Sequence, residues 1–215
     1  MNQVPEELLE KWLTGWSISR GKPLPEAWES GYRVLVGDGK QKARYVFPKV
    51  NKDFIQLAES IHEPWVYLKV CEPFEKFRSV IPERWQIQPQ GYMMYCQEKM
   101  NIRENPLPDD YSMKVFQPQP DSFMVKIYTA NKQVAAVGRL ILVDGLAVYD
   151  RVETDKDYQR KGFATQIIKE LEFIALSKGI VENFLVATAQ GKLLYESLGW
   201  KIYSLYSTIV IPEDH

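Results

Sequence analysis

The segment QRKGFA at residues 159–164 places two cations, a glycine and a small residue directly before an amphipathic stretch. The first N–H groups of a helix have no intrahelical partner, and the helix dipole adds partial positive charge at that end. Such a helix start binds anions, and a glycine lets the backbone approach the ligand closely. Arg160 and Lys161 oppose the dipole unless something negative binds. The segment therefore predicts a phosphate or diphosphate site, with two solvated cations as the alternative interpretation.

The elements around this segment are those of an α/β protein. A helix is expected from about Gly162 to Lys178, because apolar residues recur on one face and Lys178-Gly179 supplies a stop. Asp144-Gly145 is a two-residue hairpin turn between long apolar runs. Four strand-like segments precede the helix, at residues 112–117, 122–130, 133–143 and 145–154. A buried strand (184–189), a short helix (192–199) and a final pair of strands (200–206 and 207–211) follow it.

The N-terminal part alternates between helical and strand-like patterns, which favours an α/β arrangement there as well. Helices are expected at 6–19, at 51–61 and, with Pro73 at its start, at 73–81; strands are expected at 31–40, 64–71 and 91–97. The pattern changes around ENPLPDD, which contains two prolines. We therefore predict two regions, residues 1–106 and 107–215, with the boundary near residue 107.

Composition narrows the function classes. The chain of 215 residues is 45% hydrophobic and 26% charged with a formal net charge of −1, which is typical of a globular protein and provides no basic patch for nucleic acid. No apolar run is long enough to suggest a membrane span, and the first residues do not resemble a signal peptide. Cys71 and Cys96 are expected to be free thiols in the cytoplasm. His62 and His215 are the only histidines, so no metal site is predicted.

Two motifs and the element order resemble one family. Residues 159–164 match the Q/R-x-x-G-x-G/A loop of the GNAT superfamily of acyl-CoA N-acyltransferases. Residues 188–200, TAQGKLLYESLGW, resemble that family's C-terminal helix, in which a tyrosine precedes a Leu-Gly-aromatic step. The order and spacing of elements from about 107 to 211 also follow the family. The resemblance implies a GNAT-like mixed sheet flanked by helices.

The resemblance also implies acetyl-CoA, or another acyl-CoA, as the acyl donor, without a metal. The pyrophosphate is expected on the backbone N–H groups of residues 160–164. The pantetheine arm is expected beside the fourth strand, in the cleft where that strand and the next separate. Thr188 stands where many members of the family carry an asparagine that helps to hold the cofactor and the acceptor. The implied cofactor-binding residues are Val152, Glu153, Thr154, Gln159, Arg160, Lys161, Gly162, Phe163, Ala164, Thr188 and Tyr195.

Transfer of an acyl group from a thioester to an amine needs a proton donor for the thiolate and a base for the amine. By resemblance Tyr195 is the donor, with packing as its alternative role. Asp150 and Glu153 are candidate bases on the fourth strand, and Glu182 is a weaker one. Because residues of opposite parity face opposite sides of a strand, we expect only one carboxylate in the cleft, preferably that of Glu153. The alternative is that both pair with arginines or with solvent.

Only the turn at residues 118–121 separates the first two strands of the second region, where the family normally inserts two helices that form much of the acceptor wall. We expect residues 1–106 to supply that wall, as a possible diverged copy of the same fold. The acceptor stays open: a small amine, an amino acid or a protein amino group. A monomer and a homodimer are both compatible with the sequence. A non-catalytic acyl-CoA-binding or sensor module, and a nucleotide-binding protein, are the alternative functions.

Overall fold

The computed structural model describes residues 3–101 and 106–213. Contacts divide the chain into two compact units. Unit 1 consists of Met1–Met94, Val186–Lys192 and Ile202–His215, and unit 2 consists of Tyr95–Leu185 and Leu193–Lys201. The boundary expected near residue 107 stays a prediction; it follows residues 102–105, which lie outside the described residues, as does His215.

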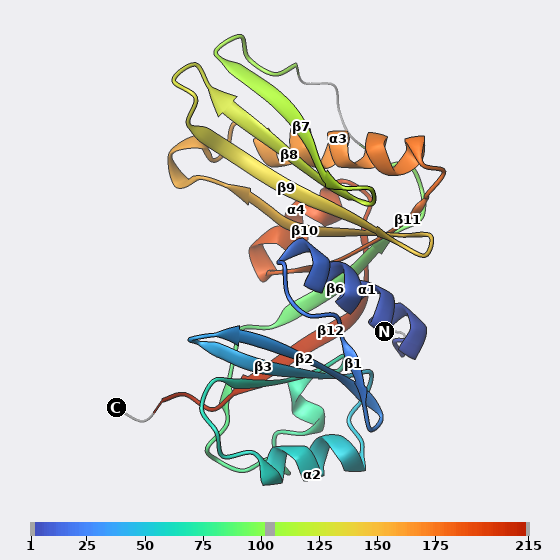
Figure 1. The fold of residues 1–215 in the computed structure, drawn as a ribbon, viewed down its shortest axis with the longest axis vertical. Helices are drawn as coiled ribbons and strands as arrows, with labels where there is room; N and C mark the ends of the chain where they lie inside the picture. Colours follow the sequence, from blue (N-terminus) through green and yellow to red (C-terminus); the bar gives the residue numbers. More distant parts are fainter. Residues whose placement is uncertain (1–2, 102–105, 214–215) are drawn as a thin grey trace. The chain divides into compact units, whose positions relative to one another are not determined.

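Unit 2 contains a mixed sheet in which the strands stand in the order β7-β8-β9-β10-β11 (Figure 1). The first four strands are antiparallel neighbours, and β11 runs parallel to β10. Their bounds are Tyr111–Gln119, Ser122–Thr129, Val134–Val143, Leu146–Thr154 and Glu182–Ala187. The four expected strand segments are therefore confirmed. The turn at Asp144-Gly145 has φ angles of 45° and 82°, a conformation that glycine adopts without strain.

Helix α3 (Phe163–Ser177) joins β10 to β11 and packs on the sheet of unit 2 (Figure 1). Its buried residues include the expected apolar face, from Phe163 and Ile167 to Ala175. The helix ends with Lys178 as its C-cap and with Gly179 at a φ of 74°, as the sequence predicts. Close packing against β9 depends on Gly138, because an added Cβ there would lie 2.3 Å from the Cγ2 atom of Ile167.

Unit 1 has its own mixed sheet, with strands in the order β1-β2-β3-β4-β12 and β5 paired with β12. The β3–β4 pair is parallel and the other pairs are antiparallel. Helix α2 (Lys52–Ser60) covers one face of this sheet, where Phe54 and Ala58 join a fully apolar cluster. The strand bounds are Glu26–Trp28, Gly31–Asp38, Gln41–Phe47, Val66–Val70, Gln86–Ile87 and Lys201–Val210, and α1 spans Glu6–Ser19.

Two expected elements differ from the structure. Residues 73–81 form only a 3₁₀ turn at Phe74–Lys76, because the side chain of Phe77 is drawn into the apolar cluster and Pro82 limits the segment. The expected final pair of strands is one continuous strand, β12, because residues 200–211 contain no Gly, Pro, Asn or Asp that would favour a turn. The strand β3 was not predicted from the sequence. Strand β6 (Gly91–Cys96) and helix α4 (Ala189–Ser197) complete the regular elements used below.

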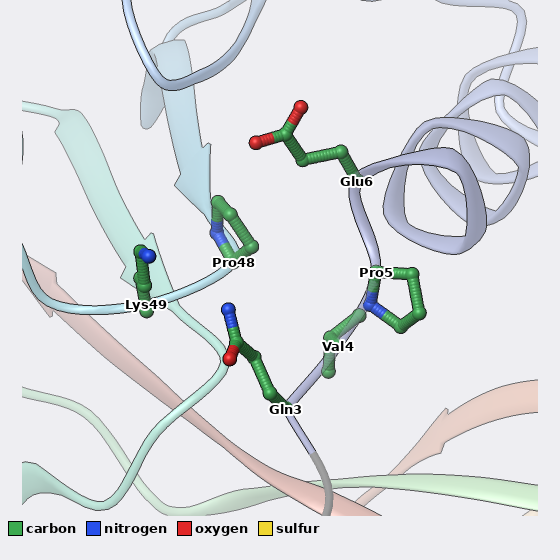
Figure 2. Close-up of a pocket in the computed structure, with 6 residues that line it drawn as sticks. All are labelled: Gln3, Val4, Pro5, Glu6, Pro48 and Lys49. Atoms are coloured by element: carbon green, nitrogen blue, oxygen red, sulfur yellow. The ribbon is translucent and has the colours of Figure 1, made fainter.

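A surface pocket of about 430 Å³ lies in unit 1, between residues 3–6 and the chain after β3 (Figure 2). Its charged side chains, Glu6 and Lys49, have opposite signs, so it does not select for a charged ligand. Among the residues described, no helix combines the length and the apolar composition needed to cross a membrane.

Candidate functional site

Strand β10 has an open edge over its second half. Its pairing with β11 covers only Leu146–Val148 opposite Glu182–Phe184, whereas its pairing with β9 continues to Thr154. Within the described residues, the edge of β10 on the β11 side therefore has no ladder partner from Tyr149 onward. The expected separation of the two strands is present. An open edge of this kind offers backbone N–H and C=O groups to an extended ligand.

A β-bulge lies in the middle of that open segment. Asp150 pairs with Arg139 and Glu153 pairs with Val137, so Arg151 and Val152 together face one residue of β9. Arg151 has a φ of 51°, which is unusual for a residue other than glycine. Because directly opposite residues share a face, and Arg139 and Val137 are two positions apart, both carboxylates lie on the same face. The premise that these two residues face opposite sides of the strand was wrong, because the bulge adds one residue between them. Which carboxylate acts as the base stays a prediction.

The loop after β10 leads into the start of α3 through two residues with positive φ. Arg160 has a φ of 62° and Gly162, the N-cap of α3, has a φ of 81°. The first hydrogen bond of the helix runs from the N–H of Gln166 to the carbonyl of Gly162 at 3.1 Å. The N–H groups of residues 163–165 therefore precede the intrahelical ladder and are oriented for an anion. Successive residues with right-handed and left-handed backbone conformations at such a turn also form a concave arrangement of N–H groups that binds anions.

The two cations of the loop have different environments. The Lys161 ammonium donates a hydrogen bond to the Tyr111 hydroxyl at 3.0 Å and lies 5.5 Å and 5.4 Å from the ring centroids of Tyr111 and Tyr158. The hydrogen bond to Tyr111 raises the pKa of Lys161. The Arg160 side chain is exposed and makes no hydrogen bond or ion pair with any described residue. Lys161 is therefore stabilised by aromatic neighbours, and Arg160 is the cation available to a bound anion.

A diphosphate carried on an extended arm fits these residues. The helix start supplies backbone donors, and the open edge of β10 supplies unpaired backbone groups along an extended strand. Between them, the Gln159 amide donates a hydrogen bond to the Thr154 carbonyl at 3.4 Å. In addition, the Thr154 Oγ1 atom is buried and has no hydrogen-bond partner among the described residues. A polar group of a ligand would satisfy that hydroxyl. The chain contains, within its described residues, no group of three or more side chains arranged to hold a metal ion.

Tyr195 lies in α4 and is 8% exposed. Its ring meets that of Trp200 edge-on, with the centroids 5.4 Å apart. Burial raises the pKa of the Tyr195 phenol, and the negative charge of Asp150 raises it further. The phenol is therefore protonated at neutral pH and can act as a proton donor.

Thr188 and Glu182 lie at the two ends of the β11 region. The Thr188 Oγ1 atom accepts a hydrogen bond from the N–H of Gly191 at 3.1 Å, so this residue caps α4. Its role toward a cofactor stays a prediction. Glu182 is opposite Leu146, at the end where β10 and β11 are still paired. It is four strand positions, or about 13 Å, from the level of Asp150, which weakens it as a base candidate.

The structure thus assigns the predicted residues to three places. Residues 150 and 152–154 lie on the open segment of β10, residues 159–164 form the loop and first turn of α3, and Thr188 and Tyr195 belong to α4 and its cap. Sequence reasoning missed Tyr111, which binds Lys161 from 50 positions away. It also missed the bulge, for which Gly138 was the available signal, because a glycine inside a strand often marks such a site.

Comparison with known proteins identifies the fold. Residues 121–202 match a family model described as an acetyltransferase (GNAT) domain. A GCN5-related N-acetyltransferase from Kribbella flavida is 15% identical, with a TM-score of 0.71 over 100% of this chain and 98% of its own. A putative acetyltransferase of the GNAT family from Novosphingobium aromaticivorans is 16% identical, with a TM-score of 0.61 over 96% and 99%. A tandem GNAT protein from the clavulanic acid biosynthesis pathway is 10% identical, with a TM-score of 0.57 over 86% and 80%.

At these identities the likeness to solved structures concerns the fold. The expected fold class, a GNAT-like mixed sheet flanked by helices, is confirmed, and the N-terminal half also resembles a tandem GNAT protein. A search of curated proteins found no match.

Proposed function

We propose that the chain, whose residues 121–202 match a GNAT acetyltransferase domain, is an N-acetyltransferase. It transfers an acyl group, most simply acetyl, from acetyl-CoA to an amine by direct attack in a ternary complex. The thioester supplies an activated acyl group, so the protein itself has to bind, orient and move protons.

One observation carries this proposal: the unpaired segment of β10 leads directly into an anion-binding helix start. An extended arm can lie along residues 149–154 while its diphosphate meets the N–H groups of residues 160–164. A helix start alone is a weak signal, and an open strand edge alone is common. Their succession within one stretch of chain matches a ligand that has an anionic group at one end and a reactive group on a long arm.

The proposed proton donor is Tyr195. Its phenol is held protonated by burial and by the charge of Asp150, so it can pass a proton to a leaving thiolate. Backbone N–H groups on the open segment of β10 are suited to polarise the acyl carbonyl, since they have no ladder partner there.

The proposed base is Glu153, with Asp150 as the alternative. Glu153 is exposed and therefore accessible to an incoming amine, whereas Asp150 is half-buried and acts electrostatically on Tyr195. The bulge brings both carboxylates to one face, so their position does not distinguish them. Substituting each residue in turn separates their roles. Glu153→Gln is expected to lower kcat and to shift the acidic limb of the pH profile, whereas Asp150→Asn is expected to act on the Tyr195 limb.

We further propose that residues 1–106 contribute the wall that binds the acceptor, because β7 and β8 form a tight hairpin and leave no room for helices between them. The acceptor is a small amine, an amino acid or a protein amino group. The cytoplasm is the proposed location, which is consistent with the two free, buried cysteines Cys71 and Cys96.

Calorimetric titration with acetyl-CoA, CoA and ATP, followed by a free-thiol assay over an amine library, tests the proposal. We expect acetyl-CoA and CoA to bind, ATP to bind weakly or not at all, and thiol release to depend on an amine. Binding of CoA without transfer to any amine, together with unchanged thioester turnover in Tyr195→Phe, would instead indicate a non-catalytic acyl-CoA sensor. Absence of CoA binding would contradict both functions.

A further inference from the structure

The sheet of unit 1 has two chemically different faces. On the face under α2, the register brings together apolar side chains such as Phe47, Leu68 and Ile209. On the opposite face the same register aligns Lys69 of β4 with Thr208 of β12 and, one position of the same parity away, Tyr206. Polar groups and a cation therefore occupy buried positions of the second face, at 5–8% exposure for Tyr206, Thr208 and Lys69.

Lys69 is the most unusual residue of that face. It is 8% exposed, and its ammonium donates a hydrogen bond to the Thr208 Oγ1 atom at 2.9 Å. The ammonium also lies 5.3 Å and 5.4 Å from the ring centroids of Tyr67 and Tyr206. Among the described residues, no carboxylate lies within ion-pair distance of Lys69. Burying an ammonium without a counter-charge is costly, and a hydroxyl and two rings offset only part of that cost.

Two arginines add positive charge around this lysine. The Arg44 guanidinium lies 3.4 Å from the ring centroid of Trp16, and the Arg20 guanidinium lies 5.0 Å from the same ring. Burial, and then the charges of Arg44 and Arg20, lower the pKa of Lys69. We call Arg20, Arg44 and Lys69 the cationic cluster. Helix α1 covers it, since Trp16 stacks on Arg44 and Trp12 packs edge-on against Tyr206 at 5.3 Å.

An unsatisfied hydroxyl accompanies the cationic cluster. Tyr206 is 5% exposed, and within the described residues its hydroxyl has no hydrogen-bond partner. It is close enough to Arg44 and Arg20 for their charges to act on it. A buried hydroxyl normally finds a partner, so an unsatisfied one in the same buried face as the Lys69 ammonium indicates that a hydrogen-bond acceptor is missing.

We propose that Lys69 and Tyr206, flanked by Arg44 and Arg20, form a binding site for one small anionic group, a carboxylate or a phosphate. Oxygens of such a group accept from the ammonium and from the phenol, and its charge offsets that of Lys69. All four residues belong to unit 1, whereas the helix start that is proposed to bind the acyl donor belongs to unit 2.

Sodium phosphate and sodium acetate serve as probes on the full chain, with sodium chloride at matched ionic strength as the reference. We expect one or both anions to raise the thermal unfolding midpoint beyond chloride and to give a binding isotherm by calorimetry. The probe that acts identifies the anion class. Lys69→Met should weaken binding about 10- to 100-fold, the range for hydrogen bonds to a charged group. Tyr206→Phe, which keeps the ring, should weaken it about 2- to 10-fold.

Lys52→Met is the matched control, since Lys52 is an exposed lysine of α2 in the same unit. It should bind the probe as the wild type does. Midpoints of the wild type that follow ionic strength alone would overturn the proposal, whatever the variants do. A phosphate response that survives Lys69→Met unchanged belongs to the start of α3 and overturns it as well.

Discussion

Gly138 offers the sharpest test of how α3 is positioned. A Cβ added there would lie 2.3 Å from the Cγ2 of Ile167, 3.2 Å from the Cδ1 of Leu171 and 3.4 Å from the Cγ2 of Val152. The first distance is far below a normal carbon–carbon contact, and both the strand and the helix are buried there. Gly138→Ala therefore forces α3 and β9 apart, at a cost of about 1–3 kcal/mol for an overpacked core. For a chain of this size we expect the unfolding midpoint to fall by about 2–12 °C.

The assay compares thermal unfolding of the wild type, Gly138→Ala and Gly145→Ala. At Gly145 the conditions are reversed: no atom lies within 4 Å of an added Cβ, but φ is 82°. That control should lose only the cost of a left-handed alanine, about 1 kcal/mol. It should leave the affinity for acetyl-CoA unchanged, whereas Gly138→Ala should weaken it, because displacing α3 moves the proposed phosphate-binding N–H groups.

A double-mutant cycle identifies the clashing atom. Ile167→Ala alone should cost about 2–5 kcal/mol, since it opens a cavity in the core. Combined with Gly138→Ala it should cost less than the sum of the two single changes, with a coupling of about 0.5–3 kcal/mol, because the added methyl group enters the space that Ile167 leaves. Additive effects, or a Gly138→Ala variant within about 0.5 kcal/mol of the wild type, would refute the close packing of α3 on β9.

Four further outcomes can be measured. Tyr195→Phe should lower kcat for thiol release about 100-fold or more with little change in KM, and an unchanged kcat would exclude it as the proton donor. Gly162→Ala, at a φ of 81°, should lower the free energy of unfolding by about 1 kcal/mol and weaken acetyl-CoA binding measured by calorimetry. An unaltered affinity would argue against phosphate binding at the start of α3. Asn51→Ala removes the 3.0 Å hydrogen bond to the N–H of Phe54, so the free energy of unfolding in urea should fall by about 1 kcal/mol, with kcat retained. Burial lowers the pKa of Lys69 well below 10.5, so the unfolded chain takes up the proton at a higher pH than the folded chain does. The free energy of unfolding of the wild type relative to Lys69→Met should therefore decline as the pH falls from 10.5 through the lowered pKa. A difference independent of pH would contradict the burial of this ammonium.

Local patterns were sufficient for much of unit 2. The alternation of the four strand segments, the Asp144-Gly145 turn and the apolar face of α3 each depend on residues close in sequence, and each is confirmed. Local patterns were weaker in unit 1, where β3 was overlooked and residues 73–81 were expected to be helical. There, long-range packing of Phe77 against the cluster under α2 overrides the local preference.

The candidate site divides in the same way. The start of α3 follows from six consecutive residues, since a glycine N-cap and free N–H groups are local properties of a helix end. The common face of Asp150 and Glu153 does not, because a bulge depends on how β10 pairs with β9. Nor does the environment of Lys161, whose partner Tyr111 lies in a different strand.

The amino-acid sequence by itself therefore determined the four strands before α3, the helix α3 and the glycine turn that begins it, because these arise from contacts within a few residues. Only the tertiary structure decided which side chains meet. It brought Lys69 of β4 beside Thr208 and Tyr206 of β12, residues more than 130 positions apart, into one buried face. Pairing between distant strands sets register and face, and a single chain's local preferences contain no information about either.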